Sequence, residues 1–120
     1  MKICIGLVLL RVVLFPCVLS AEWSVESILP SGQIIDTSLA FQSDNAPVIA
    51  FCEEGVLRIA FWRANAWEVE DVVSGGNVKI CNLVFDSTGS PLILYSNTAD
   101  FTVHLAEWNG AEWTDTLIAG

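Results

Sequence analysis

Basic residues and histidine are scarce in this chain. Its 120 residues include five lysines and arginines and one histidine, against fourteen aspartates and glutamates, and the formal net charge is −9. A nucleic-acid-binding protein needs a basic face that neutralises phosphate, so this charge argues against a nucleic-acid partner. One histidine is too few for a typical zinc site, and no EF-hand loop pattern is present. We therefore expect no metal and no cofactor, and the length excludes a large α/β enzyme.

The first twenty residues differ in composition from the rest. Residues 1–20 contain no acidic residue, carry Lys2 at their start and continue as an apolar run in which Arg11 is the one charged residue. This pattern predicts a secretory signal peptide, cleaved after Ser20 or Ala21. An uncleaved anchor is the alternative, but the run is short for a membrane span and carries a charge. We expect an exported protein, secreted, periplasmic or at the cell surface, with no stable membrane insertion after cleavage.

Removal of this segment makes the chain more acidic. Three basic and all fourteen acidic residues remain, a net charge of −11 over the last hundred residues. Such a charge keeps a protein soluble and repels nucleic acid and anionic lipid.

The remaining chain repeats itself. SLAFQSDNAPVIAF (38–51) aligns without a gap with NLVFDSTGSPLILY (82–95) at an offset of 44 residues. LRIAFWRANAW (57–67) aligns with VHLAEWNGAEW (103–113) at an offset of 46. We place the two additional residues in the turn at 97–100, because insertions in turns cost little. The sequence therefore contains two copies of one unit.

Each copy predicts four short strands, because apolar runs alternate with turn clusters. In the first copy the strands are expected at 38–42, 48–52, 57–63 and 67–73, and in the second at 80–86, 92–95, 101–108 and 113–118. Residues 23–28 repeat the fourth strand and predict an extra N-terminal strand. No helical periodicity follows the signal segment.

The inner strands are apolar on both faces and the outer strands are polar, which is typical of β-propeller blades. We predict an all-β fold of two four-stranded antiparallel propeller-type blades plus the extra strand. The expected divisions are a leading outer strand and linker at 21–33, a first blade at 34–77 and a second blade at 78–120.

The tryptophans and the repeated apolar positions are assigned by their place in the strands. Trp23, Trp67 and Trp113 begin outer strands, where we expect them to fill the wedge between blades. Trp62 and Trp108 end third strands beside loops, and are the candidates for stacking against a ligand such as a sugar ring. The remaining predicted core positions of the repeat are Leu39, Phe41, Leu83 and Phe85.

The second copy resembles a known kind of repeat. DSTGSPLILY (86–95) followed by LAEWNGAEW (105–113) is similar to the repeats of secreted bacterial β-propeller proteins, and the resemblance implies that fold. The tail from Trp108 to Trp113 also resembles two-repeat propeller lectins, which complete a propeller by oligomerising and bind sugar between blades. Their sugar-binding arginine lies in the second strand, where this chain has VIAFC (48–52) and LILYS (92–96). A fucose-type site is therefore not expected.

Cys52 and Cys81 are the cysteines that remain after the signal segment. Cys52 ends the second strand of the first copy and Cys81 begins the first strand of the second. In adjacent antiparallel blades these positions lie at the same end, so a disulfide is within reach. Two cysteines in an exported chain favour a disulfide over a metal site, with two buried thiols as the alternative.

Two blades cannot close a ring. Each end of the stack leaves an apolar face open, and repeats of this kind need about three or more copies for a continuous core. Large open apolar faces mark interfaces. We therefore expect either self-association or further blades in a longer chain.

The sequence favours an exported, non-enzymatic binding module whose ligand is a glycan or a protein. The alternatives are a structural fragment of a longer propeller protein, and a remnant of a sialidase-like or other glycosidase propeller. For an enzyme, the nearest carboxylates are Glu53, Glu54, Asp86 and Glu107. Glycosidases need two carboxylates facing across a pocket, whereas adjacent glutamates in a turn are typical solvated residues. His104 has no serine or cysteine partner at a suggestive spacing, and the Asp86–Gly89 spacing differs from the sialidase Asp-box.

Overall fold

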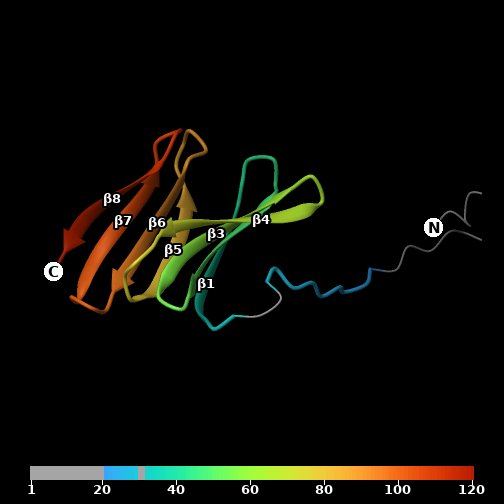
Figure 1. Ribbon diagram of the computed structural model, residues 1–120. Coiled ribbons are helices and arrows are strands. Elements are labelled where there is room, and N and C mark those ends of the chain that lie inside the picture. The colour runs from blue at the N-terminus through green and yellow to red at the C-terminus, as the bar shows by residue number, and fades with distance from the viewer. Residues whose placement is uncertain (1–20, 30–31) are drawn as a thin grey trace, which may run out of the picture.

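The structure, a computed structural model, describes residues 21–29 and 32–120, and the predicted signal peptide lies outside these residues. Its described part is all-β, with eight strands in two four-stranded antiparallel sheets and no helix (Figure 1). Sheet 1 consists, in spatial order, of β1 (Ile34–Phe41), β2 (Pro47–Glu53), β3 (Val56–Arg63) and β4 (Ala66–Val73). Sheet 2 consists of β5 (Val78–Phe85), β6 (Pro91–Asn97), β7 (Thr102–Trp108) and β8 (Trp113–Ala119). The all-β prediction and the two antiparallel sheets are confirmed.

The two sheets share their irregularities as well as their strand order. The pairing register shifts between Ile34 and Asp36 in sheet 1 and between Val78 and Ile80 in sheet 2. It shifts again at the start of the third strand of each sheet. Because β-bulges re-aim the side chains that follow them, bulges at counterpart positions present counterpart residues on the same face.

The turns between the second and third strands account for the change of offset. In sheet 1 the turn is Glu54-Gly55, with both residues at positive φ (51° and 83°), as in the tight hairpin turns that suit twisted strands. In sheet 2 the corresponding turn runs over four residues, 98–101. The two additional residues lie where the alignment places them.

The hydrophobic core lies between the two sheets. One face of sheet 1, here called its packed face, carries Val48, Ala50, Leu57 and Ile59, all fully buried. The packed face of sheet 2 contributes residues such as Leu83 and Ile93 to the same cluster. β5 lies against β1 and β2, so the contact is closest at the first strands of the sheets.

Each sheet also has an outer face, which points away from the other sheet. On sheet 1 it includes Leu39 and Phe41, and on sheet 2 it includes Ile80, Val84 and Leu94, all of which are exposed. Strand pairing fixes these assignments, because neighbours across a ladder point to the same side. Both outer faces therefore carry exposed apolar side chains.

The extra N-terminal strand differs from the prediction. Residues 21–29 contain no strand, and Trp23, expected to fill a wedge between blades, is fully exposed. A strand needs a partner edge, and none of the described strands pairs with this segment. Residues 26–29 instead pass over the outer face of sheet 1.

Two sheets do not form a ring, and the propeller-type arrangement of the blades stays a prediction. No helix in the described part of the chain is long and apolar enough to cross a membrane.

Candidate ligand site between the sheets

A hollow of about 270 Å³ opens between sheet 1 and sheet 2 at the ends of their outer strands. We call it the inter-sheet hollow. It is lined by Gln42, Phe61, Arg63, Glu70, Gly89, Pro91, Trp108 and Trp113. Its volume lies just below the range of typical small-molecule sites, which begins at about 300 Å³. The hollow therefore suits a ligand of roughly one ring.

Two tryptophans form one wall of the hollow. Trp108 ends β7 and pairs across the ladder with Trp113, which begins β8. Their rings meet edge to face, with centroids 5.7 Å apart and planes at 62°. The connecting turn is tied by Asn109, whose Oδ1 accepts hydrogen bonds from the backbone N–H groups of Ala111 and Glu112, each at 2.9 Å. The sequence thus fixes the orientation of both indoles through one short hairpin.

Glu70 joins this wall to the opposite sheet. The indole N–H of Trp113 donates a 3.1 Å hydrogen bond to Glu70 Oε1. Pairing of Glu70 with the buried Ile59 puts the carboxylate on the packed face of sheet 1. Among the described residues, Glu70 Oε2 has no hydrogen-bond partner, so it remains an acceptor for a ligand. Glu70 is not among the site residues predicted from the sequence, because alternation of Glu68 and Glu70 also fits an exposed outer strand.

Arg63 lies at the rim of the hollow. Its guanidinium donates a 3.0 Å hydrogen bond to Glu68 and lies 4.1 Å above the centre of the Phe61 ring. Half of its side chain is exposed. A guanidinium has five N–H donors, so the ion pair leaves several of them available.

The hollow therefore combines an aromatic wall with a donor and an acceptor. Indole faces pack well against apolar C–H surfaces, while Arg63 and Glu70 offer directional hydrogen bonds. Gln42 adds a side-chain amide that both donates and accepts. A pyranose ring presents this mixture, with C–H groups on its faces and hydroxyls around its edge.

Trp62, the other stacking candidate, lies elsewhere. It pairs with Trp67 in the same edge-to-face manner, with centroids 5.3 Å apart. These two indoles line a separate hollow of about 310 Å³ on the outer face of sheet 1, together with Pro47 and Ile28. Trp62, Trp67 and Pro47 are the repeat counterparts of Trp108, Trp113 and Pro91. The structure thus contains the same aromatic wall twice, but only one copy faces a second sheet.

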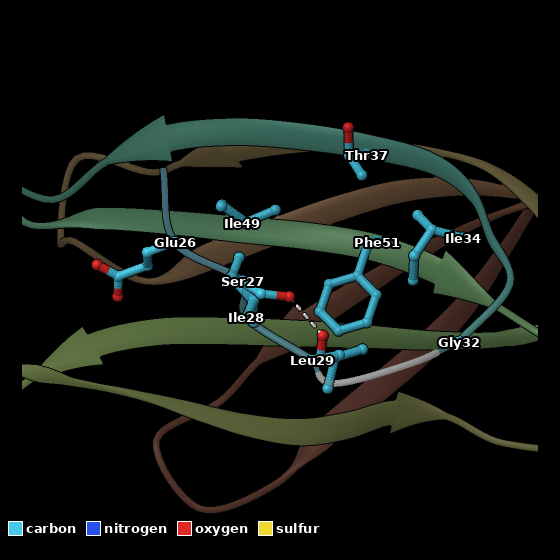
Figure 2. Close-up of a pocket in the computed structure, with 9 residues that line it drawn as sticks. All are labelled: Glu26, Ser27, Ile28, Leu29, Gly32, Ile34, Thr37, Ile49 and Phe51. Atoms are coloured by element: carbon cyan, nitrogen blue, oxygen red, sulfur yellow. Dashed lines mark hydrogen bonds between the residues drawn. The ribbon is translucent and has the colours of Figure 1, made fainter. Parts of the chain in front are cut away.

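A third hollow, of about 330 Å³, lies beneath residues 26–29 (Figure 2). Ile28 and Leu29 cross sheet 1 beside Ile49 and Phe51, and the Ser27 hydroxyl donates a 2.6 Å hydrogen bond to the Leu29 carbonyl. No backbone hydrogen bond joins described residues 21–29 to the strands beneath them. This segment is held mainly by apolar contact.

Cys52 and Cys81 meet across the two packed faces. Both are buried free thiols. A hydrogen bond between them lowers the pKa of Cys52 and raises the pKa of Cys81, which burial raises further. The two sulfurs thus lie together, as the positions of Cys52 and Cys81 in their strands predict, and whether they are bridged stays a prediction.

A hydroxyl, an imidazole and a carboxylate also lie in line on sheet 2. His104 Nδ1 is 2.9 Å from Asp115 Oδ2, and His104 Nε2 is 2.8 Å from Thr102 Oγ1. The spacing matches the array that activates hydroxyl nucleophiles. However, Thr102 Oγ1 also lies 2.5 Å from Asp100 Oδ1, so its proton is directed to that carboxylate. Tyr95 stacks on His104 and donates to Asp115, so we interpret the cluster as a brace within the sheet.

The carboxylates considered for an enzyme are not brought together in the inter-sheet hollow. Glu53 forms an ion pair with Arg58. Asp86 Oδ1 accepts three hydrogen bonds from Thr88 and Ser90 within its own turn. Within residues 21–29 and 32–120, no group of three or more histidine, cysteine or acidic residues is placed to hold a metal ion.

Comparison of the chain with family models, curated proteins and solved structures gives no match.

Proposed function

We propose that this chain is an exported, non-enzymatic β-propeller-type module that binds a glycan in the inter-sheet hollow. The observation that carries the proposal is the convergence of Trp108, Trp113, Arg63 and Glu70 from two sheets on one small hollow. Export rests on the signal-like pattern of residues 1–20, and the blade arrangement rests on the repeat.

The chemistry of the hollow supports a neutral sugar as ligand. Trp108 and Trp113 offer apolar surface, and one donor group and one acceptor group flank them. The strongly acidic net charge disfavours anionic ligands. Discrimination would come from hydrogen bonds to hydroxyls, because unpaired polar groups in a site penalise the wrong analogue.

An open face of either sheet also suits a protein ligand, which is the alternative use of such a module. The apolar side chains Leu39 and Phe41 are more than half exposed, at 56% and 58%. Contiguous exposed apolar groups of this kind mark interaction surfaces.

A glycan array followed by calorimetric titration of the best ligand tests the proposal. We expect Trp108→Ala to weaken binding at least about tenfold, because it removes the stacking wall. Glu70→Gln keeps an acceptor for the Trp113 indole but removes the charge, so it should weaken binding without loss of fold.

Trp23→Ala is the matched control, because it removes the same side chain from a fully exposed position outside the hollow. Its affinity should equal that of the unmodified protein. Binding that survives Trp108→Ala unchanged, or the absence of any glycan ligand, contradicts the proposal.

A further inference from the structure

We propose that copies of this chain associate head to tail, with the outer face of sheet 2 of one copy on the outer face of sheet 1 of the next. The proposal does not depend on glycan binding. It rests on a correspondence between the faces that pack inside one chain and the faces that remain open.

The outer face of sheet 1 repeats the packed face of sheet 2. Leu83 and Leu39 occupy the same repeat position, yet Leu83 is 4% exposed and Leu39 is 56% exposed. Phe85 packs against the core, whereas its counterpart Phe41 is 58% exposed. Further identical pairs are Ile49 with Ile93, Ala60 with Ala106, and Trp67 with Trp113. Within one chain, the packed face of sheet 1 covers Leu83.

The outer face of sheet 2 is the repeat counterpart of the packed face of sheet 1. Val84 and Leu94 correspond to Ala40 and Ala50, which lie on the packed face of sheet 1. In sheet 2 the two side chains are larger and exposed, at 54% and 45%. The two outer faces thus repeat the two packed faces, and the two packed faces fit each other within the chain. Contacts between unlike surfaces of this kind are heterologous, and join copies in series.

Two buried polar atoms lack partners, and head-to-tail docking supplies both. The Trp67 indole N–H and the Ser96 hydroxyl are inaccessible and unpaired among the described residues. Between the two sheets of one chain, Trp113, the repeat counterpart of Trp67, donates a hydrogen bond to Glu70. The repeat counterpart of Glu70 is Thr116. Thr116 Oγ1 of the next copy is therefore the acceptor for the Trp67 indole. Buried donors without acceptors are rare and costly, so each one calls for a partner.

Ser96 follows the same correspondence. It is the counterpart of Cys52, and the neighbour of Cys52 across the sheets is Cys81. The counterpart of Cys81 is Thr37 on the outer face of sheet 1. Docking thus pairs the Ser96 hydroxyl with the Thr37 hydroxyl of another copy.

A backbone contact has a counterpart too. Inside the chain, Ser38 Oγ accepts a 2.9 Å hydrogen bond from the N–H of Leu83. Asn82 takes the place of Ser38 in sheet 2, and Leu39 takes the place of Leu83 in sheet 1. The Asn82 side-chain carbonyl therefore lies where it accepts from the Leu39 N–H of the next copy.

Residues 21–29 are the competing occupant of the sheet 1 face. They cover Ile49 and Phe51 but leave Leu39 and Phe41 exposed. They provide no hydrogen-bond partner for the Trp67 indole N–H or the Ser96 hydroxyl, and they form no strand there. A second copy covers the whole face and displaces them.

A mixing experiment with two variants tests the association. Leu39→Asp places a charge on the sheet 1 face and Val84→Asp places one on the sheet 2 face, and either charge is costly to bury. Each residue is more than half exposed in the single chain, so both variants should fold. The unmodified protein should sediment as an oligomer, and each variant alone as a monomer.

An equimolar mixture of the two variants should form a dimer and nothing larger, because one intact face of each type remains. Phe101→Asp is the matched control, since Phe101 is 85% exposed in the turn between β6 and β7. It should oligomerise like the unmodified protein, with a dissociation constant unchanged within about threefold, against at least a tenfold loss for each face variant.

Cysteine cross-linking reads the register directly. Thr37→Cys in one copy and Ser96→Cys in another reproduce the spatial relation of Cys81 and Cys52. Mild oxidation of the mixture should give a disulfide-linked heterodimer, and either variant alone should give no covalent dimer.

A monomeric unmodified protein overturns the proposal and leaves the faces to further sheets or to another protein. Association lost in Leu39→Asp but kept in Val84→Asp overturns it as well, since the contact would then be face to face between two sheets 1. Cross-linking of a single variant with itself has the same meaning.

Discussion

The repeat offers a matched pair of substitutions that measures how much one packed sheet contact contributes to stability. Leu83→Ala and Leu39→Ala make the same chemical change at the same repeat position, once between the sheets and once on the outer face. Leu to alanine removes three carbon groups, each contributing about 0.8 kcal/mol when fully buried. Because Leu83 is 4% exposed, nearly all of the resulting about 2.4 kcal/mol is lost there. The cavity left behind brings the total into the range of about 2–5 kcal/mol.

Leu39 should behave differently in the single chain. It is 56% exposed, so less than half of the transfer free energy applies, or about 1 kcal/mol, and no enclosed cavity forms. Urea denaturation at a concentration low enough to keep the chain monomeric measures both values as shifts in midpoint at constant slope. We expect a difference of at least about 1.5 kcal/mol between the variants. Equal losses of stability, or a larger loss for Leu39→Ala, would refute the assignment of packed and outer faces.

Three further predictions concern local features. Oxidation should join Cys52 to Cys81 and stabilise the fold by about 3.5 kcal/mol through loop entropy, and two titratable thiols in the denatured, non-reduced protein would exclude the bridge. Hydrogen bonds from the Thr88 hydroxyl and the Ser90 N–H hold the pKa of Asp86 below its ordinary value. The stability that Asp86 contributes should therefore be full above the ordinary carboxyl pKa and disappear as the pH falls through the lower folded value. Melting curves of Asp86→Asn should lack this component, and an unchanged pH profile would contradict it. Ala64 has φ = 50° in the turn between β3 and β4, a region that costs a residue with a Cβ roughly 1–2 kcal/mol, so Ala64→Gly should raise the melting temperature.

Repetition made the two sheets predictable. Matching positions in the copies imposed the same strand order, and the change of offset located the longer turn in sheet 2. The proximity of Cys52 and Cys81 followed from strand polarity alone. These features depend on backbone topology, which hydrophobic alternation and turn residues encode locally.

The choice of contacting faces was not predictable in the same way. Both faces of the inner strands are apolar in sequence, so alternation does not distinguish a packed face from an open one. The roles of Glu70 and Arg63 were missed for a related reason, since a carboxylate in an outer strand fits an exposed surface equally well. Only the register of β4 on β3 places Glu70 toward Trp113.

The extra strand failed for want of a partner edge. Residues 23–28 resemble β4 in sequence, but β-structure forms only where a ladder is completed. β4 has a free edge, but that strand carries several charged side chains. Residues 26–29 do not pair with it and lie across the outer face of sheet 1 instead.

The contacts made by Asp36 and Ser38 also bear on aggregation. Their side chains accept hydrogen bonds from the backbone N–H groups of Cys81 and Leu83, each at 2.9 Å, along the free edge of β5. Unpaired N–H groups on an edge strand are a template on which another strand can add. Side chains of sheet 1 thus accept hydrogen bonds from N–H groups at the edge of β5, so these groups are not free to pair with a strand of a misfolded chain. Strand addition of the amyloid type is thereby hindered at β5, one of the four edge strands of the two sheets.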